Sequence, residues 1–295
     1  MIIQKLLKQK VIHPPKFLPT NTHYLTLMGS VAYGCSSDTS DCDVYGFCIP
    51  NLEMIFPHLA GEIPGFGKQI KRFAQWQEHH VKDVGSEKEY DFSVYSIIKY
   101  FQLCMENNPN MVNSLFTPVN CVIHSTQIGD MVRENRRIFL HKGCWPKFKG
   151  YAYSQLHKMK VKTPKENGKR YENIQKFGYD VKFAYHIVRL LDEVEQILTT
   201  GNLDLQRSKE TLKEIRRGGW SEEQIRSYFD SKEKDLETVY AESKLPWGPD
   251  EDKIRDLLMK CLEHHFGSLD KAVVVPNKLE NALRQIKGIC EDTGV

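Results

Sequence analysis

Two short apolar segments, separated by a run of small and acidic residues, constrain the fold of this chain more than any other feature. The stretch reads MGSVAYGCSSDTSDCDVYGFCIP over residues 28–50. The first apolar run, Leu25–Met28, ends at Gly29-Ser30, as a buried strand would. The second, Val44–Ile49, is rich in β-forming residues and stops at a proline. The pattern predicts two neighbouring strands joined by a tight glycine-containing corner.

An Asp-x-Asp pair opens the second of these strands. Residues i and i+2 of a strand point to the same side, so Asp41 and Asp43 place two carboxylates on one face. Like charges this close raise each other's pKa unless a cation lies between them. Oxygen ligands without neighbouring His or Cys suit a hard cation such as Mg²⁺. Alone, Asp-x-Asp is usually a solvated turn or cap; the ordered set of motifs is much rarer. Asp38 is out of register and is expected to be a loop residue.

Gly29 and Ser30 supply a second element of the predicted site. Glycine permits close backbone approach, and serine adds a hydroxyl and an amide N–H. If a helix begins here, its free N–H groups and dipole favour phosphate. A phosphate cradle beside metal-binding carboxylates predicts transfer from a nucleoside triphosphate.

The rest of the chain divides into a mixed front half and a helical back half. Residues 97–105 are expected to form a helix that Asn107-Asn108-Pro109 ends, because proline disfavours helical geometry just before it. Residues 57–88 contain several glycines and prolines and are interpreted as a loop or insertion. Residues 179–199 carry a clear amphipathic helical pattern. Further helices are predicted at 206–217, 221–243 and 250–266. The expected class is α+β, with domains at 1–140 and 141–295.

The segment from Gly29 to Asp43 resembles the Gly-Ser…Asp-x-Asp signature of the DNA polymerase β-like nucleotidyltransferase superfamily. It is most similar to the branch of bacterial and phage-encoded predicted nucleotidyltransferases. Two further segments support the resemblance, Tyr90-Asp91 with the helix and Asn-Pro turn after it, and the helix that follows Phe177-Gly178. The similarity spans about residues 25–205. One departure is Asn113, where the family pattern leads us to expect a glutamate. The residues that match the signature are Gly29, Ser30, Gly34, Ser40, Asp41 and Asp43.

The resemblance implies a polymerase β-like mixed sheet and two-metal chemistry. By this similarity Asp41, Asp43 and Asp91 would hold two Mg²⁺ ions, and Asp91 could also accept the proton of the nucleophile. Glu89 has the same strand parity as Asp91 and is the alternative third carboxylate. Asp91 could equally be a strand-edge or capping aspartate. The residues implied in nucleotide binding are Gly29, Ser30, Lys182, His186 and Arg189, of which the last three could instead form a solvated helix face.

A strongly basic stretch covers residues 142–176, with ten cations, two acids and a local net charge of +8, against +3 for the whole chain. Aromatic residues are interleaved with these cations. Cations bind phosphates and aromatic rings stack on unpaired bases, so the stretch predicts contact with a structured RNA. The alternative is a charged helix whose aromatics belong to the core. The proposed RNA contacts are Lys158, Lys160, Lys162, Lys169 and Arg170.

These observations favour a magnesium-dependent nucleotidyltransferase that moves a nucleoside monophosphate from an NTP to a hydroxyl, with RNA as the expected acceptor. A protein-modifying (AMPylating-type) enzyme or toxin and a non-catalytic nucleic-acid-binding module are the alternatives. No stretch of 18 apolar residues occurs, so no transmembrane helix is expected. Eight scattered cysteines without a Cys-x-x-Cys pair favour a reducing, cytoplasmic compartment. Oligomeric state is not encoded in any pattern we identify.

Overall fold

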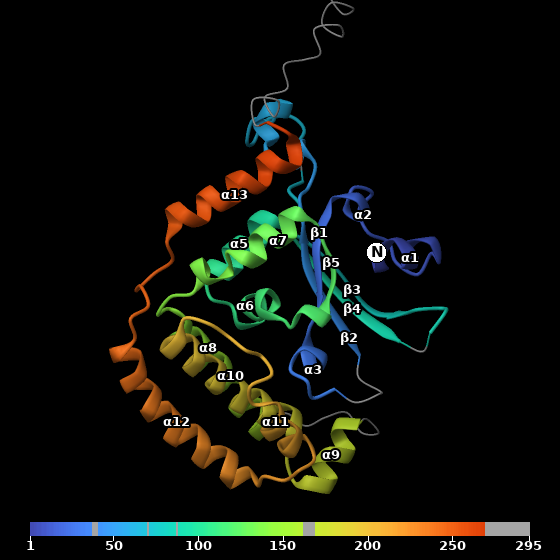
Figure 1. Ribbon diagram of the computed structural model, residues 1–295. Coiled ribbons are helices and arrows are strands. Elements are labelled where there is room, and N and C mark those ends of the chain that lie inside the picture. The colour runs from blue at the N-terminus through green and yellow to red at the C-terminus, as the bar shows by residue number, and fades with distance from the viewer. Residues whose placement is uncertain (37–40, 70, 87, 162–168, 269–295) are drawn as a thin grey trace, which may run out of the picture.

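The computed structural model describes residues 1–268 except 37–40, 70, 87 and 162–168. It is an α+β fold with a mixed sheet, as expected, and the sheet has five strands in the order β3-β4-β2-β1-β5 (Figure 1). The β2–β4 pair is parallel and the other three pairs are antiparallel. The strands are β1 (Thr22–Leu27), β2 (Cys42–Cys48), β3 (Gln75–Lys82), β4 (Glu89–Ser96) and β5 (Val122–Ser125).

Helices cover the sheet and make up the C-terminal half (Figure 1). Those of the first 140 residues are α1 (Ile2–Lys8), α2 (Leu18–Asn21), α3 (Gly29–Ala32), α4 (Leu52–Ile55), α5 (Ile97–Met105), α6 (Pro109–Phe116) and α7 (Gln127–Glu134), with 3₁₀ turns η1 (Pro57–Ala60), η2 (Val119–Cys121) and η3 (Arg136–Phe139). The later helices are α8 (Cys144–Val161), α9 (Lys169–Phe177), α10 (Val181–Thr200), α11 (Lys209–Arg216), α12 (Glu222–Glu242) and α13 (Glu251–Phe266).

Each face of the sheet has its own apolar core. Val44 and Phe92 face α1, where Ile3 and Leu6 are fully buried. Phe47 of β2 faces the other side, in a core that continues through α5 and α10 to α12. Because side chains alternate along a strand, Asp43 shares the face of Phe47. The aspartates of β2 and β4 are thereby presented toward the helical half of the molecule.

α10 is the central helix of the C-terminal half and packs against α8, α11 and α12. Asp180 caps its first turn by accepting from the Lys182 N–H, and Gly201 ends it with a left-handed φ of 61°. α13 returns to the sheet, where His265 Nδ1 and His23 Nε2 of β1 lie 3.0 Å apart. None of the helices that the structure describes is long and apolar enough to cross a membrane.

The interpretation of residues 57–88 as loop or insertion is wrong in part, because β3 lies within them. Only Trp76 and Val81 of this edge strand are buried, so its apolar alternation is weak. The register also shifts between Glu78 and Val81, where His80 takes a left-handed φ of 57°. This β-bulge breaks the period-two pattern by which a strand is detected.

Candidate active site

A cavity of about 480 Å³ lies between the N-terminal end of β2 and the helices α9, α10 and α11. It brings together every residue predicted for metal or nucleotide binding, from segments up to 160 residues apart in the chain. The predicted residues that line it are Gly29, Ser30, Asp41, Asp43, Asp91, Lys182, His186 and Arg189. Acidic side chains form the wall on the sheet side, and cationic side chains form the wall on the helical side.

The acidic wall depends on strand register. Asp43 and Asp91 are directly paired across the parallel β2–β4 ladder, so their side chains lie side by side on one face. Asp41 precedes β2 by one residue and is exposed. Burial, followed by the charge of the Asp91 carboxylate, raises the pKa of Asp43, whereas the Lys182 ammonium opposes this shift. The pKa of Asp43 therefore depends on its burial, on the neighbouring Asp91 carboxylate and on the Lys182 ammonium that faces them.

Gly29 makes room for Asp43. Its φ is +63°, and a Cβ placed there would lie 2.2 Å from Asp43 Oδ2. Only glycine fits this position, because it tolerates the left-handed conformation and leaves the carboxylate its space. The Met28 N–H donates to the Asp43 carbonyl oxygen at 2.7 Å, and this hydrogen bond joins the turn after β1 to β2. The helix that begins at Gly29, α3, has only four residues.

His80, at the β3 bulge, contacts both candidate third carboxylates. The backbone N–H of His80 donates to Asp91 Oδ1 at 2.8 Å, while its ring Nδ1 lies 2.6 Å from Glu89 Oε1. The hydrogen bond to Glu89 raises the pKa of His80. Asp91 lines the cavity and Glu89 does not. The geometry thus favours Asp91 over Glu89 as the third acidic residue.

The donor set of the acidic wall consists of carboxylate oxygens, which suits a hard cation such as Mg²⁺. Among the residues that the structure describes, no three His, Cys, Asp or Glu side chains are grouped tightly enough to hold a metal by themselves. Mg²⁺ usually takes one or two carboxylates and completes its shell with water and substrate phosphates. The wall fits that incomplete coordination.

The cationic wall is more varied than its sequence pattern indicates. Lys182 is exposed at the cavity, and His186 is half-buried with its ring 4.2 Å from that of Tyr185. Arg189 is only 5% exposed and pairs with Glu193 at 3.0 Å. The alternative of a solvated helix face is therefore wrong for Arg189, and Glu193, one turn further along α10, is buried as well. At Arg189 and Glu193 this face packs on the residues that follow β1, so these two groups are buried and bonded to each other.

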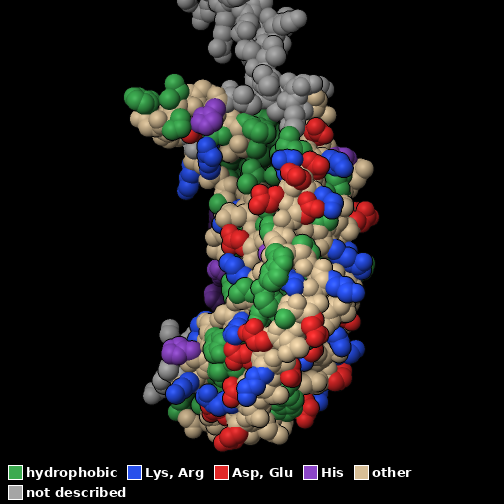
Figure 2. All heavy atoms as spheres, turned by 90° about the vertical axis from the view of Figure 1, so that its left-hand side faces the viewer, with side chains coloured by type: hydrophobic (Ala, Val, Ile, Leu, Met, Phe, Trp, Pro, Cys, Tyr) green, Lys and Arg blue, Asp and Glu red, His purple; other side chains and the backbone are tan. Residues whose placement is uncertain are grey.

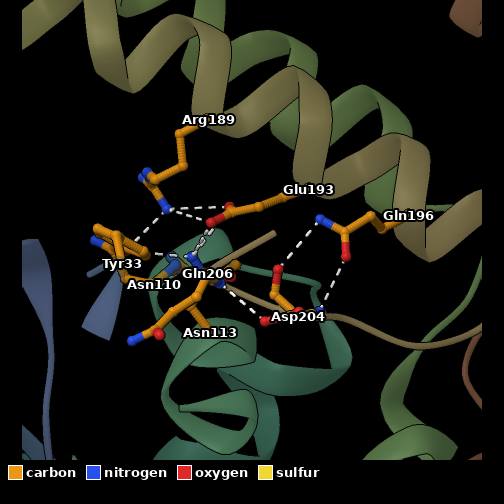
Figure 3. Close-up of polar contacts among 9 residues, drawn as sticks. Tyr33, Asn110, Asn113, Arg189, Glu193, Gln196, Asp204 and Gln206 are labelled. Carbon is orange, nitrogen blue, oxygen red and sulfur yellow. Dashed lines mark hydrogen bonds and ion pairs between the residues drawn. The ribbon is translucent and has the colours of Figure 1, made fainter. Parts of the chain in front are cut away.

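Figure 3 shows how Arg189 is held. Its Nη1 donates to both carboxylate oxygens of Glu193 and to the Tyr33 hydroxyl, at 3.0 and 2.8 Å. Asn113 Nδ2 also donates to both Glu193 oxygens at 3.0 Å. The pair and its amide partner connect α10, α6 and the corner. Asn113, which departs from the family pattern, thus contacts a carboxylate that α10 supplies.

A family model described as the RNA repair pathway DNA polymerase beta family (RlaP) matches residues 4–260. The chain belongs to this family. Membership agrees with the polymerase β-like nucleotidyltransferase resemblance drawn from the motifs of residues 29–43, 90–116 and 177–190. The RlaP family is of the polymerase β type and its name places it in RNA repair. Comparison with curated proteins gives no match.

Much of the basic stretch has structural partners in this RlaP member. Lys149 pairs with Glu233 and Glu237 of α12 at 2.7 and 2.9 Å, and Lys147 pairs with Glu106 at 3.7 Å. Lys142 is buried, with its ammonium 4.3 Å from the centre of the Trp247 ring. Trp145 and Phe148 are core residues, so the prediction that the interleaved aromatics stack on bases is wrong for these two.

Of the predicted RNA contacts, Lys158 and Lys160 are exposed on the last turns of α8 and do not line the cavity. Lys162 lies outside the described residues, as do Asp38 and Ser40. Lys169 and Arg170 begin α9, and their side chains are outside the description. RNA binding by these five residues remains a prediction.

Sequence reasoning missed several residues of the cavity wall. Arg216 of α11 lines it, donates to the Cys35 carbonyl oxygen and lies 5.4 Å from the centre of the Tyr185 ring. No local motif marks Arg216, because it reaches the cavity only through the packing of α11 against α10. The other missed wall residues are Met28, Tyr33, Tyr45, Asn110, Asn173, Val181 and Tyr185.

Proposed function

We propose that this RlaP protein is a magnesium-dependent nucleotidyltransferase that transfers a nucleoside monophosphate from an NTP to a hydroxyl of RNA. The observation that carries the proposal is the cavity itself, which sets three carboxylates opposite Lys182 and Arg216 with Gly29-Ser30 at its edge. Membership in the polymerase β family named for RNA repair supports the reaction class and the acceptor. Charge of both signs around one small space suits a polyanionic substrate bound with a cation.

In the proposed reaction an acceptor hydroxyl attacks the α-phosphorus of the NTP. A new P–O bond forms, the bond to the α–β bridging oxygen breaks, and pyrophosphate leaves. Asp41, Asp43 and Asp91 would hold two Mg²⁺ ions, and Asp91 would accept the hydroxyl proton. Bound there, Mg²⁺ supplies charge neutralisation for the triphosphate and lowers the pKa of the hydroxyl.

The residues of the protein mainly bind and orient. Lys182 and Arg216 would neutralise the triphosphate from the helical wall, with Ser30 offering a hydroxyl and His186 a ring nitrogen from opposite sides. Gly29 keeps the backbone close to Asp43. Phosphoryl-type transfer consists largely of positioning and electrostatic stabilisation, which is what these groups provide. Lys158, Lys160, Lys162, Lys169 and Arg170 would guide the RNA backbone.

The decisive experiment incubates the full chain with Mg²⁺, each of the four α-³²P-labelled NTPs, and either RNA or total protein as acceptor. We expect label on RNA with the wild type and none with the Asp41→Ala, Asp43→Ala double variant. Glu89→Gln is the matched control, since Glu89 lies on the same strand face as Asp91 but outside the cavity.

Label on protein instead of RNA would contradict the acceptor and identify an AMPylating-type enzyme. RNA binding without any label transfer would indicate the non-catalytic module. Unchanged transfer by the double variant would remove Asp41 and Asp43 from the mechanism.

A further inference from the structure

Residues 29–35, which we call the corner, follow β1 and begin with Gly29-Ser30. Three hydrogen bonds connect the corner to the helical half of the molecule. Gln206 Nε2 donates to the Ala32 carbonyl oxygen at 3.2 Å, and Arg216 Nη1 donates to that of Cys35. Arg189 Nη1 donates to the Tyr33 hydroxyl at 2.8 Å (Figure 3). The three contacts come from α10, from α11 and from the loop between them.

At this contact Arg189 binds protein partners through Nη1. Its side chain is 5% exposed and that of Glu193 is 3% exposed. The guanidinium carbon lies 4.3 Å from the centre of the Tyr33 ring, and the buried Nε has no partner among the described residues. A buried charge is costly unless it is paired and hydrogen-bonded. Glu193, oriented by Asn113, therefore keeps Arg189 in place and neutralises the charge that a phosphate would otherwise attract.

The position of the corner bears directly on Asp43. The Gly29 backbone packs so closely on the Asp43 carboxylate that a Cβ would be 2.2 Å from Oδ2. A shift of the corner would move that carboxylate or open a gap beside it. Misplacement of a reacting group by about 1 Å can reduce the rate by about a hundredfold.

We propose that Arg189, Glu193 and Asn113 form a positioning device, which holds Tyr33 and thereby sets the corner against Asp43. Arg189 then acts through Tyr33 and is not a phosphate ligand, unlike the role that the family resemblance implies for it. The expected effect on kcat rests on the proposed transfer reaction. The expected effect on the position of the corner does not depend on that reaction.

Tyr33→Phe is the sharpest test, because it removes one hydroxyl and leaves the buried ion pair intact. We expect kcat per folded molecule to fall about tenfold, with KM for the NTP changed less than about threefold, since the defect is in positioning. Hydrogen exchange of amides 29–35 should become faster while exchange in α10 stays unchanged. A hydroxyl that contributes only to overall stability would leave kcat per folded molecule unchanged and would not speed exchange in the corner selectively over α10.

Glu193→Gln extends the test, with a larger expected loss of kcat and of protection in the corner. The matched control is Glu195→Gln on the same helix, which removes a carboxylate paired with Lys232 at 2.7 Å outside the cavity. We expect wild-type kcat and exchange from this control. Wild-type exchange and kcat in Tyr33→Phe, or a tenfold rise in KM for the NTP with unchanged kcat, would overturn the proposal. Exchange needs no turnover, so absence of transfer by the wild type would contradict the proposed function and leave this test in force.

Discussion

The two walls of the cavity are built in different ways. The acidic wall comes from the neighbouring interior strands β2 and β4, where strand register places Asp43 beside Asp91. The cationic wall comes from α10 and α11, and its members have unequal freedom: Lys182 is exposed, whereas Arg189 is buried against Glu193. One strand pair, β2 with β4, makes the first wall, whereas packing between helices α10 and α11 makes the second.

The basic stretch sharpens this contrast. It is the most cationic part of the sequence, yet Lys147 and Lys149 of α8 pair with Glu106 and Glu233, and Lys142, just before α8, lies over the Trp247 ring. Figure 2 shows Lys and Arg side chains interspersed with Asp and Glu over the face of the molecule that it presents. Charge density along the chain therefore says little about where a cation can meet substrate.

The largest expected effect is on the acidic wall. Asp43→Asn should lower kcat about a thousandfold, since a metal-bound transition state is stabilised by several kcal/mol, and 1.36 kcal/mol is tenfold. Single-turnover transfer measures the loss, with Glu89→Gln as control. A loss of kcat of less than about tenfold would show that Asp43 does not hold the catalytic metal and that the reaction does not take place at the acidic wall.

The second prediction concerns the space that Gly29 leaves for Asp43. Gly29→Ala should reduce kcat about a hundredfold, because the added Cβ displaces the carboxylate and strains the left-handed backbone. Gly150→Ala in α8 is the control: its Cβ would meet nothing within 4 Å, and alanine should stabilise the helix by up to about 1 kcal/mol. Equal activity of the two variants would contradict the close approach of the corner to Asp43.

The third prediction tests the cationic wall. Lys182→Ala should raise KM for the NTP about tenfold, the worth of one hydrogen bond to a charged group, with a smaller change in kcat. Lys149→Ala removes a cation of the same type whose partners are Glu233 and Glu237. Steady-state kinetics on both variants decide the question. If the two variants raise KM for the NTP equally, the rise comes from the loss of one positive charge and not from the position of Lys182 in the cavity.

The smallest effect is expected in the basic stretch. Replacing Lys158 and Lys160 by alanine should reduce the salt-dependence slope of RNA binding by about 1.4, at about 0.7 for each contact with a single-strand phosphate. Lys147→Ala, which removes a cation paired with Glu106, should leave the slope unchanged. Filter binding at several salt concentrations provides the measurement. An unaltered slope in the double variant would make both lysines part of a solvated face.

Patterns in the sequence predicted the α+β class and the placement of Asp41 and Asp43 on one face, whereas the mixed sheet and Asp91, with Glu89 as its alternative, were implied only by the family resemblance. The predictions from patterns follow from local rules: alternation puts Asp41 and Asp43 on one face, glycine allows the corner, and apolar periodicity marks α10. The strand β3 escaped detection because a bulge interrupts its alternation and only Trp76 and Val81 are buried.

Only the tertiary structure decided which cations face the cavity and which are neutralised. The spacing of Lys182 and Arg189 puts them on one face of the same helix, and Arg216 belongs to no motif. Their roles depend on which carboxylates and hydroxyls lie opposite them, such as Glu193 and Tyr33 for Arg189. Because charged groups respond to partners brought close by folding, their pairing is set by packing across the whole chain and not by spacing along it.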